Sequence, residues 1–358
     1  MIDSNRSVKP NSSVAGLRDS GRIKKVERPD DRTEENRFDP IIEIRELTKV
    51  YGKAGNTARP ALDHVTLAIP RGSLFGLLGP NGAGKSTLIN IMAGLTVKTS
   101  GSVSILGMNI DREPRNAKAA IGVVPQEINL GRFVRPAELL EDQAGLYGLR
   151  RAERRTDEIL KITGLYDKRD SYIQALSGGM KRRLLVAKAM VHNPPVLVLD
   201  EPTAGVDIEL RRQLWDTVRE MNRRGTTILL TTHYLEEAEE LCDHIAVINH
   251  GRVVVNEDKS SLLARLGTKY LKLHLHNAID PIPEVLSPYN PFHETKEDGS
   301  VWLTLHYPPN VTEAGDILIA IGEARLSVID LTMEETDLED VFLHLVRESD
   351  IQSSNRLL

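Results

Sequence analysis

Features that the sequence lacks exclude several classes of protein. Among its 358 residues there is a single cysteine, Cys242, so no intrachain disulfide can form and a reducing compartment fits best. No run approaches the roughly 18 consecutive apolar residues that span a bilayer, since Val196–Leu199 and Ile228–Leu230 are short. The formal net charge is −5, whereas a nucleic-acid-binding surface needs a basic face, so no nucleic-acid partner is predicted. If the protein acts at a membrane, another chain must supply the span.

The composition that is present is typical of a globular protein. Hydrophobic residues make up 40% of the chain and charged residues 27%, and the length suits one large domain or two smaller ones. Residues 1–38 differ from the rest, because they hold nine Lys/Arg and seven Asp/Glu with few apolar residues. They lack the apolar stretch of a secretory signal, so we interpret them as a disordered polar tail. A docking arm is the alternative, and nothing in the sequence supports it.

Short apolar runs alternate with helical patterns from Ile41 onward. Continuous apolar runs such as Val196–Leu199 suit a sheet that is buried on both faces, which predicts an α/β fold with a mainly parallel sheet. The predicted strands are Ile41–Ile44, Val65–Ile69, Leu74–Leu78, Val103–Ile105, Ile121–Val124, Val196–Leu199, Thr226–Thr231 and Ile245–Ile248.

A mainly helical block, residues 127–192, interrupts this alternation. Pro136 fits the first position of a helix, and Gly148 fits its end. A second helix is predicted from about Ala152 to Thr163, before Gly164. The apolar face of the first helix is predicted to contain Leu139, Leu140, Gln143, Leu146 and Tyr147.

The pattern changes again after about residue 266. Leu271, Leu273 and Leu275 alternate with polar residues, as in a half-buried strand, and the run Val301–Leu305 repeats this period. A helix near 317–321, a strand near 326–329 and a helix near 338–346 follow. We therefore predict a small α+β appendage over residues 267–358, without catalytic residues.

The segment from Gly79 to Ser86 matches the pattern G-x-x-x-x-G-K-[ST] and follows the strand predicted at Leu74–Leu78. Its glycines let successive backbone amides point at one anion, Lys85 adds a positive charge, and the Ser86 hydroxyl can coordinate Mg²⁺. The helix that follows directs its positive end at the phosphates. We expect nucleotide phosphates to be bound by Gly79, Pro80, Asn81, Gly82, Ala83, Gly84, Lys85, Ser86 and Thr87.

A phosphate loop alone would also fit a kinase or a GTPase, so other residues must decide. The apolar strand Val196–Leu199 ends in Asp200 and Glu201. Asp200 is placed to hold Mg²⁺, and Glu201 is placed to polarise an attacking water.

A second anion site is predicted at Leu176–Met180, ahead of a helix over Lys181–Val191 that Ser177 can cap. The hydroxyl of Ser177 and the unobstructed amides of Gly178 and Gly179 would meet the positive end of that helix. One chain with one nucleotide has no obvious need for two such sites. Two chains arranged head to tail do, because each can cover the nucleotide of the other.

These motifs together resemble the ABC ATPase family over about residues 41–255. Gly79–Ser86 is similar to its Walker A loop, Leu176–Met180 to its signature, and Val196–Glu201 to its Walker B strand. The resemblance implies ATP and Mg²⁺ as ligands, with Ser86, Asp200 and Gln126 at the metal. It also implies an adenine contact by Tyr51, a Q-loop at Gln126, a D-loop over Ala204–Asp207 with Asp207 as its acid, and a switch histidine at His233.

Two variants resemble the ABC-2-type export subfamily, to which drug-resistance and nodulation-factor exporters belong. The signature ends in Met180 where glutamine is usual, and the D-loop begins with Ala204-Gly205. Leu338–Leu343 resembles a C-terminal pattern of the same exporters. The loop Lys53–Arg59 is longer than usual, which weakens the expectation for Tyr51.

The sequence therefore predicts the ATP-binding and ATP-hydrolysing subunit of an ABC-2-type exporter, working through closure of a nucleotide-dependent dimer. We expect a homodimer or a dimer with a paralogue, bound to an integral membrane permease at the cytoplasmic face of the inner membrane. The predicted organisation is a tail (1–38), an ATPase domain (39–266) and a small C-terminal domain (267–358) with a regulatory or dimer-supporting role. The alternatives are the ATPase subunit of an importer and a soluble ABC ATPase without a transport role.

Overall fold

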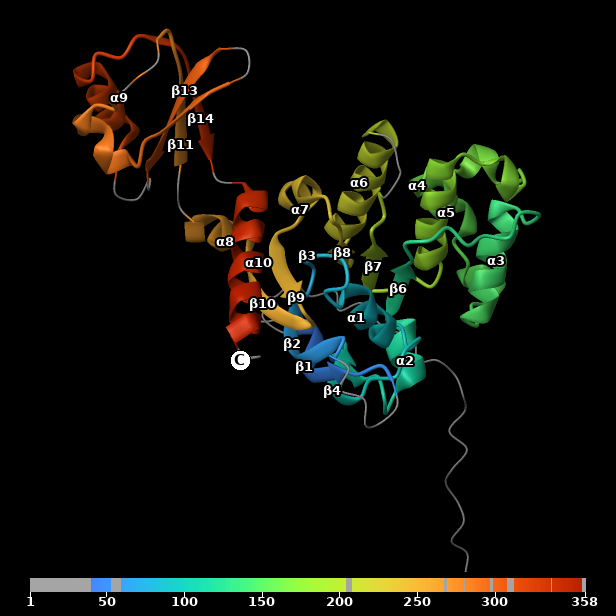
Figure 1. Cartoon of the computed structure of the whole chain (residues 1–358). Coiled ribbons are helices and arrows are strands. Elements are labelled where there is room, and N and C mark those ends of the chain that lie inside the picture. The colour runs from blue at the N-terminus through green and yellow to red at the C-terminus, as the bar shows by residue number, and fades with distance from the viewer. Residues whose placement is uncertain are drawn as a thin grey trace, which may run out of the picture.

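The structure is a computed structural model of the whole chain, shown in Figure 1. It describes residues 40–52, 59–203, 208–266, 269–277, 279, 281–296, 299–307, 312–335 and 337–355. The predicted tail, most of the loop Lys53–Arg59 and the predicted D-loop lie outside these ranges. Within the described residues, none of the helices has the length and apolar content to cross a membrane.

A six-stranded sheet forms the centre of the molecule, and its strands are parallel except for the antiparallel edge strand β10. Every residue of β3 and β8 is buried, as expected for strands that are covered on both faces. The predicted α/β fold with a mainly parallel sheet is confirmed. In spatial order the strands are β10 (Arg252–Asp258), β9 (His244–Asn249), β3 (Leu74–Leu78), β8 (Thr227–Thr231), β7 (Val196–Asp200) and β6 (Ile121–Val124).

The strands predicted at Ile41–Ile44, Val65–Ile69 and Val103–Ile105 form a second, antiparallel sheet and do not join the central one. Its spatial order is β2 (Leu62–Pro70), β1 (Pro40–Lys49), β4 (Ser100–Ile105) and β5 (Met108–Asn109). Helix α1 (Lys85–Met92) packs with both sheets in one apolar core that includes Ile42, Phe75 and Leu88. The strands β2 and β4 have polar residues between their buried apolar ones, whereas β3 and β8 are buried throughout.

The other face of the central sheet is covered by helices. Trp215 and Val218 of α6 (Ile208–Arg223) and Leu241 of α7 (Leu235–Leu241) share a core with Leu230 of β8. The remaining helices of this region are α2 (Pro114–Ala119) and α8 (Lys259–Leu266).

The helical block stands beside the sheet and has its own apolar core (Figure 1). Its helices are α3 (Pro136–Leu146), α4 (Thr156–Ile162) and α5 (Gly178–Met190), with 3₁₀ turns at Arg151–Glu153, Tyr166–Lys168 and Ile173–Ala175.

Two details of the block differ from the prediction. The buried face of α3 is formed by Pro136, Leu140 and Ala144, whereas Leu146 is 81% exposed. The predicted helix 152–163 is interrupted, because a 3₁₀ turn precedes α4 and the chain between them is extended at Arg154.

The C-terminal segment begins as a separate unit with a core of its own (Figure 1). Its antiparallel sheet has the order β12 (Phe292–Thr295), β13 (Val301–Tyr307), β11 (Lys269–Leu275) and β14 (Val328–Glu335). Helix α9 (Ala314–Glu323) and the 3₁₀ turn Glu284–Tyr289 pack on it. The alternation predicted for Leu271, Leu273 and Leu275 is confirmed, since all three are buried.

The last helix, α10 (Leu338–Asn355), returns to the central sheet (Figure 1). Leu338, Val341 and Leu345 are buried in the same core as Val255 of β10 and Leu262 of α8. Asp350 accepts a hydrogen bond of 2.8 Å from the Asn249 side chain. Helix α10 is thus part of the core of the central unit, although it follows the C-terminal sheet in the sequence.

Candidate functional site

The loop after β3 has a backbone path that only glycine allows at two positions. A Cβ atom on Gly79 would lie 2.2 Å from the Ile248 carbonyl oxygen, so any side chain there would displace the neighbouring strand. Gly84 has φ 113° and would bring a Cβ to 2.6 Å from the Ala61 carbonyl oxygen. The loop is therefore held close against β9 and β2 while it curls into α1.

The Lys85 ammonium lies within this loop and is 6% exposed. It donates hydrogen bonds to the carbonyl oxygens of Gly79, at 2.6 Å, and Pro80, at 3.1 Å. Burial lowers the pKa of Lys85, while the charges of Glu201 and Asp200 act in the opposite direction. A buried cation bound to neutral carbonyls inside a glycine-rich loop at a helix start fits a polyphosphate well.

Four predicted site segments meet at one edge of the central sheet. The strands β3, β6, β7 and β8 are parallel, so their carboxyl ends point the same way, and each is followed by one of the segments. These segments are the glycine loop after β3, Gln126 after β6, Glu201 after β7 and His233 after β8.

The side chains of the last three converge on one carboxylate oxygen. The Gln126 amide donates a hydrogen bond of 2.8 Å to Glu201 Oε2. The Nδ1 atom of His233 lies 3.3 Å from the same oxygen. The Glu201 side chain is mostly buried, whereas His233 is half-exposed, so the carboxylate is shielded but can be approached from outside the sheet.

The neighbouring carboxylate, Asp200, is oriented from β8. The Thr231 hydroxyl donates a hydrogen bond of 2.6 Å to Asp200 Oδ1. Ser86 is the second residue of α1, directly after the glycine loop, and is exposed. A carboxylate and a hydroxyl are hard oxygen donors, and together they fit Mg²⁺.

The Glu201 backbone adopts the left-handed conformation, with φ 45°. Its N–H donates to both the carbonyl and the hydroxyl oxygen of Thr231, each at 3.1 Å. Its carbonyl accepts a short hydrogen bond from Arg182 of α5. A non-glycine residue at this φ costs on the order of 1–3 kcal/mol and persists where the surroundings hold it in place.

Arg182 is a residue of this site that the sequence analysis missed. Its side chain is 2% exposed, although it lies in a run of basic residues that is typical of a solvated helix face. Little in the sequence indicated that Arg182 is buried, because a position in a helix does not by itself reveal which side chain points inward.

The predicted signature segment has the geometry of an anion site. The Ser177 hydroxyl accepts a hydrogen bond of 3.2 Å from the Met180 N–H and so caps α5, as predicted. Ser177 and Gly178 are exposed, whereas Gly179 is buried. The free end of a 13-residue helix is thus offered at the surface of the helical block.

Two predicted contacts are less defined. Tyr51 follows β1 and is 50% exposed, with the Lys49 ammonium 4.7 Å from the centre of its ring. Such an exposed ring is open to stacking. The predicted D-loop acid, Asp207, lies outside the described residues.

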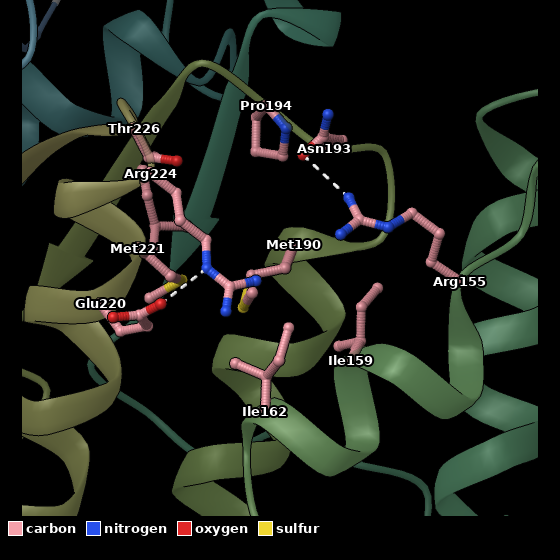
Figure 2. A pocket seen from close by; sticks show the side chains of 11 residues that line it. Arg155, Ile159, Ile162, Met190, Asn193, Pro194, Glu220, Met221, Arg224 and Thr226 are labelled. Carbon is pink, nitrogen blue, oxygen red and sulfur yellow. Dashed lines mark hydrogen bonds and ion pairs between the residues drawn. The ribbon is translucent and has the colours of Figure 1, made fainter.

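A pocket between the helical block and the central sheet lies at the opposite edge (Figure 2). It is lined by Ile159, Met190 and Met221 and flanked by Arg155, which donates to Asn193. Its lining also includes Pro194 and Thr226, which precede β7 and β8, so the pocket lies near the amino ends of these strands, whereas Glu201 and His233 follow their carboxyl ends.

Comparisons with known proteins agree with this geometry. Residues 62–204 match the family model described as ABC transporter. A daunorubicin/doxorubicin resistance ATP-binding protein from Streptomyces peucetius is 42% identical over 66% of this chain and 71% of its own. A Nod factor export ATP-binding protein I from Cupriavidus metallidurans is 34% identical over 85% of this chain and 97% of its own. The chain belongs to the ABC transporter ATP-binding proteins.

Solved ABC cassettes share the fold. An ATP-binding subunit of an ABC transporter aligns with a TM-score of 0.57 at 31% identity, covering 63% of this chain and 93% of that one. A dimeric ATP-binding cassette in a post-hydrolysis state, bound to ADP and Pi, aligns with a TM-score of 0.54 at 27% identity, covering 61% and 98%. The chain is therefore an ABC ATPase that binds and hydrolyses ATP, and its relatives are of the exporter type.

Proposed function

We propose that this ABC ATPase powers an ABC-2-type membrane exporter through nucleotide-driven closure of a dimer. The observation that carries the proposal is the convergence of Gln126 and His233 on the Glu201 carboxylate, at the sheet edge that holds the glycine loop. The export and drug-resistance relatives support the direction of transport.

Each residue of the edge has a role that follows from its chemistry. The loop amides and Lys85 bind the β- and γ-phosphates of ATP, which Lys85 reaches by exchanging its carbonyl partners for phosphate oxygens. Mg²⁺, held by Ser86 and Asp200 with Gln126 nearby, would neutralise charge that develops on the phosphates. Tyr51 stacks on the adenine.

Hydrolysis depends on the Glu201 carboxylate. Glu201 accepts a proton from the attacking water or polarises it, and His233 donates a hydrogen bond toward the γ-phosphate. The Gln126 amide donates a hydrogen bond to Glu201 Oε2, so its position responds to whether the water and the phosphate are in place.

The exposed first turn of α5 completes the site of another chain. Ser177, Gly178 and Gly179 bind the γ-phosphate held by the partner's glycine loop. Two such chains, identical or paralogous, close around two ATP molecules. Loss of the γ-phosphate contact on hydrolysis removes this bridge and reopens the dimer.

A cavity next to this turn suits the permease. It has a volume of about 570 Å³, lies between the segment after Gln126 and the start of α5, and includes Ile128 and Leu130 in its wall. Exposed Phe133 continues the apolar surface. A coupling helix of an integral membrane subunit would dock here by its apolar face, and with this partner the protein would work on the cytoplasmic side of the inner membrane.

The paired variants Lys85→Ala and Glu201→Gln test the assigned chemistry. Lys85→Ala removes a charge-assisted contact, so ATP affinity should fall by more than about tenfold. Glu201→Gln keeps the loop, so ATP should bind normally while kcat falls by roughly a hundredfold or more. ATP binding by isothermal titration and phosphate release measure the two effects.

Lys161→Ala, on the surface of α4, is the control and should match the wild type in both assays. Normal turnover in Glu201→Gln would overturn the assignment of Glu201. Normal ATP affinity in Lys85→Ala would overturn that of the loop.

A further inference from the structure

Arg182 carries a buried cation that binds neutral groups. Within the described residues, each hydrogen bond recorded for its guanidinium is donated to a backbone carbonyl oxygen. Burial lowers the pKa of Arg182, and the nearby charges of Asp200 and Glu201 oppose this effect. Such a desolvated charge is costly, so its position is kept only where several acceptors surround it.

The acceptors come from two different motifs. From the Q-loop, the carbonyl oxygens of Pro125 and Gln126 lie 2.8 and 2.7 Å from Nη1. From the end of β7, the Pro202 oxygen lies 2.6 Å from Nε, and the Glu201 oxygen accepts from Nη2. The planar guanidinium thereby joins two loops that follow neighbouring strands.

The third motif is the helix on which Arg182 itself lies. Arg182 is five residues after Ser177, in the second turn of α5, and the helix start at Ser177 and Gly178 is exposed. A displacement of α5 as a rigid body therefore carries the guanidinium with it, since helices move as units in packed proteins.

The Glu201 peptide is gripped from two sides. Thr231 of β8 holds its N–H, and Arg182 holds its carbonyl. The left-handed φ of 45° at Glu201 depends on both contacts, because an unrestrained residue would relax to negative φ and turn its side chain away from Gln126.

We propose that Arg182 is a positioning residue that couples the two ATP sites of the dimer. The coupling rests on the composite site proposed above, in which α5 contacts the partner's ATP while Glu201 serves the chain's own ATP. Closure on the partner's γ-phosphate sets the position of α5, and Arg182 transmits it to the Glu201 peptide and the Q-loop. Each site thus hydrolyses ATP efficiently only when the other is filled.

The test uses Arg182→Lys and Arg182→Gln in the full chain. Lysine keeps the charge but loses the planar fork, and glutamine loses both. We expect the ATP dissociation constant to stay within about twofold, because Lys85 and its loop are untouched. The value of kcat should fall roughly tenfold to hundredfold with little change in KM, as for a misplaced catalytic group. The Hill coefficient for ATP should fall to 1.

Arg183→Lys is the matched control, since Arg183 is the next residue on α5 and donates to the Thr163 and Gly164 carbonyls within the helical block. It should keep wild-type kcat and cooperativity. Circular dichroism and ATP binding monitor folding, and if Arg182→Gln misfolds, Arg182→Lys decides the result. Wild-type kcat and Hill coefficient in Arg182→Lys, or equal losses in Arg183→Lys, would overturn the proposal.

Dimer formation separates this inference from the proposed function. In the Glu201→Gln background, Arg182→Lys should still form the MgATP-dependent dimer, because the surfaces that meet are unchanged. If Glu201→Gln binds ATP but does not dimerise even with Arg182 intact, the proposal of a composite ATP site is wrong. The proposed coupling by Arg182 is then wrong as well, because it depends on that site.

Discussion

At the scale of single residues, the conformation of Glu201 explains why this site is assembled from distant parts of the chain. Its left-handed backbone is held by Thr231, and its carboxylate is oriented by Gln126 and His233. The cost of the strained φ is offset by contacts from three segments that are more than 18 residues away in sequence. Such preorganisation keeps the carboxylate in place before a substrate arrives.

His192 provides a pH-dependent prediction. Burial lowers the pKa of His192 to about 4, its Nε2 donates to the Ile121 carbonyl oxygen at 3.2 Å, and its ring stacks on Tyr147. In the unfolded chain His192 takes up a proton below about pH 6.5, whereas in the folded chain it does so only near pH 4. The contribution of neutral His192 to the free energy of unfolding is therefore full above about pH 6.5 and is lost progressively toward pH 4. Charging this single group should cost roughly 3 kcal/mol of unfolding free energy across that window.

The measurement is urea unfolding of the wild type and His192→Phe between pH 7.5 and 4.5. Phenylalanine keeps the stacking on Tyr147 but cannot take up a proton, so its stability curve should be flatter over this range. If the unfolding free energies of the two proteins fell in parallel as the pH is lowered, the pKa of His192 would not be lowered by folding, and the prediction would be wrong.

At the scale of elements, helix α10 packs with the central unit although it follows the C-terminal sheet in the sequence. Three of its apolar residues complete the core of the central unit, and each buried side chain contributes about 1.5–3 kcal/mol. The sheet of β11–β14 has its own core and is linked to the central unit through α8 and α10.

Two truncations test this division. Replacing residues 269–335 by a short Gly/Ser linker keeps α10, and every predicted ATP-site residue lies before residue 234. This variant should stay folded and bind MgATP with a dissociation constant within about twofold of the wild type. Removing everything after residue 266 exposes the α10 contact surface and should lower Tm by several degrees, roughly. A linker variant that keeps its circular dichroism spectrum but loses ATP binding would contradict this account.

The elements show which features a sequence pattern can predict. The glycine loop, the capped start of α5 and the acidic end of β7 were predicted because each is encoded in neighbouring residues. The separate antiparallel sheet was not predicted, although β2 and β4 have polar residues between their apolar ones and β3 has none. A local run does not encode which distant strand it pairs with. The exposed Leu146 was assigned to the wrong face of α3, because Ala144 provides the buried contact instead.

Contacts between residues far apart in the sequence could also not be predicted from local sequence patterns. Arg182 reaches carbonyls 18 to 57 residues away, and α10 packs against strands about 100 residues earlier. Carbonyl acceptors have no residue type, so no motif marks the Arg182 network. The site side chains Gln126, Glu201 and His233 were easier to predict, because parallel strands bring their carboxyl ends to one edge.

At the scale of the whole molecule, the ATP-binding loop and the signature helix lie on different units of the chain. The loop joins β3 to α1 in the central unit, whereas Ser177 caps α5 in the helical block (Figure 1). Both present helix starts that favour anions, and Ser177 and Gly178 of the signature are exposed. The account explains the second anion site as half of a partner's nucleotide site.

Size-exclusion chromatography with light scattering tests this claim most directly, on Glu201→Gln with and without MgATP. The variant should shift from monomer to dimer when MgATP is added, because ATP binds but is not consumed. Adding Ser177→Arg should abolish the shift by crowding the partner's γ-phosphate, whereas Asp142→Arg on the exposed side of α3 should leave it intact. A Glu201→Gln protein that binds ATP yet stays monomeric, both alone and with its membrane partner, would contradict the account.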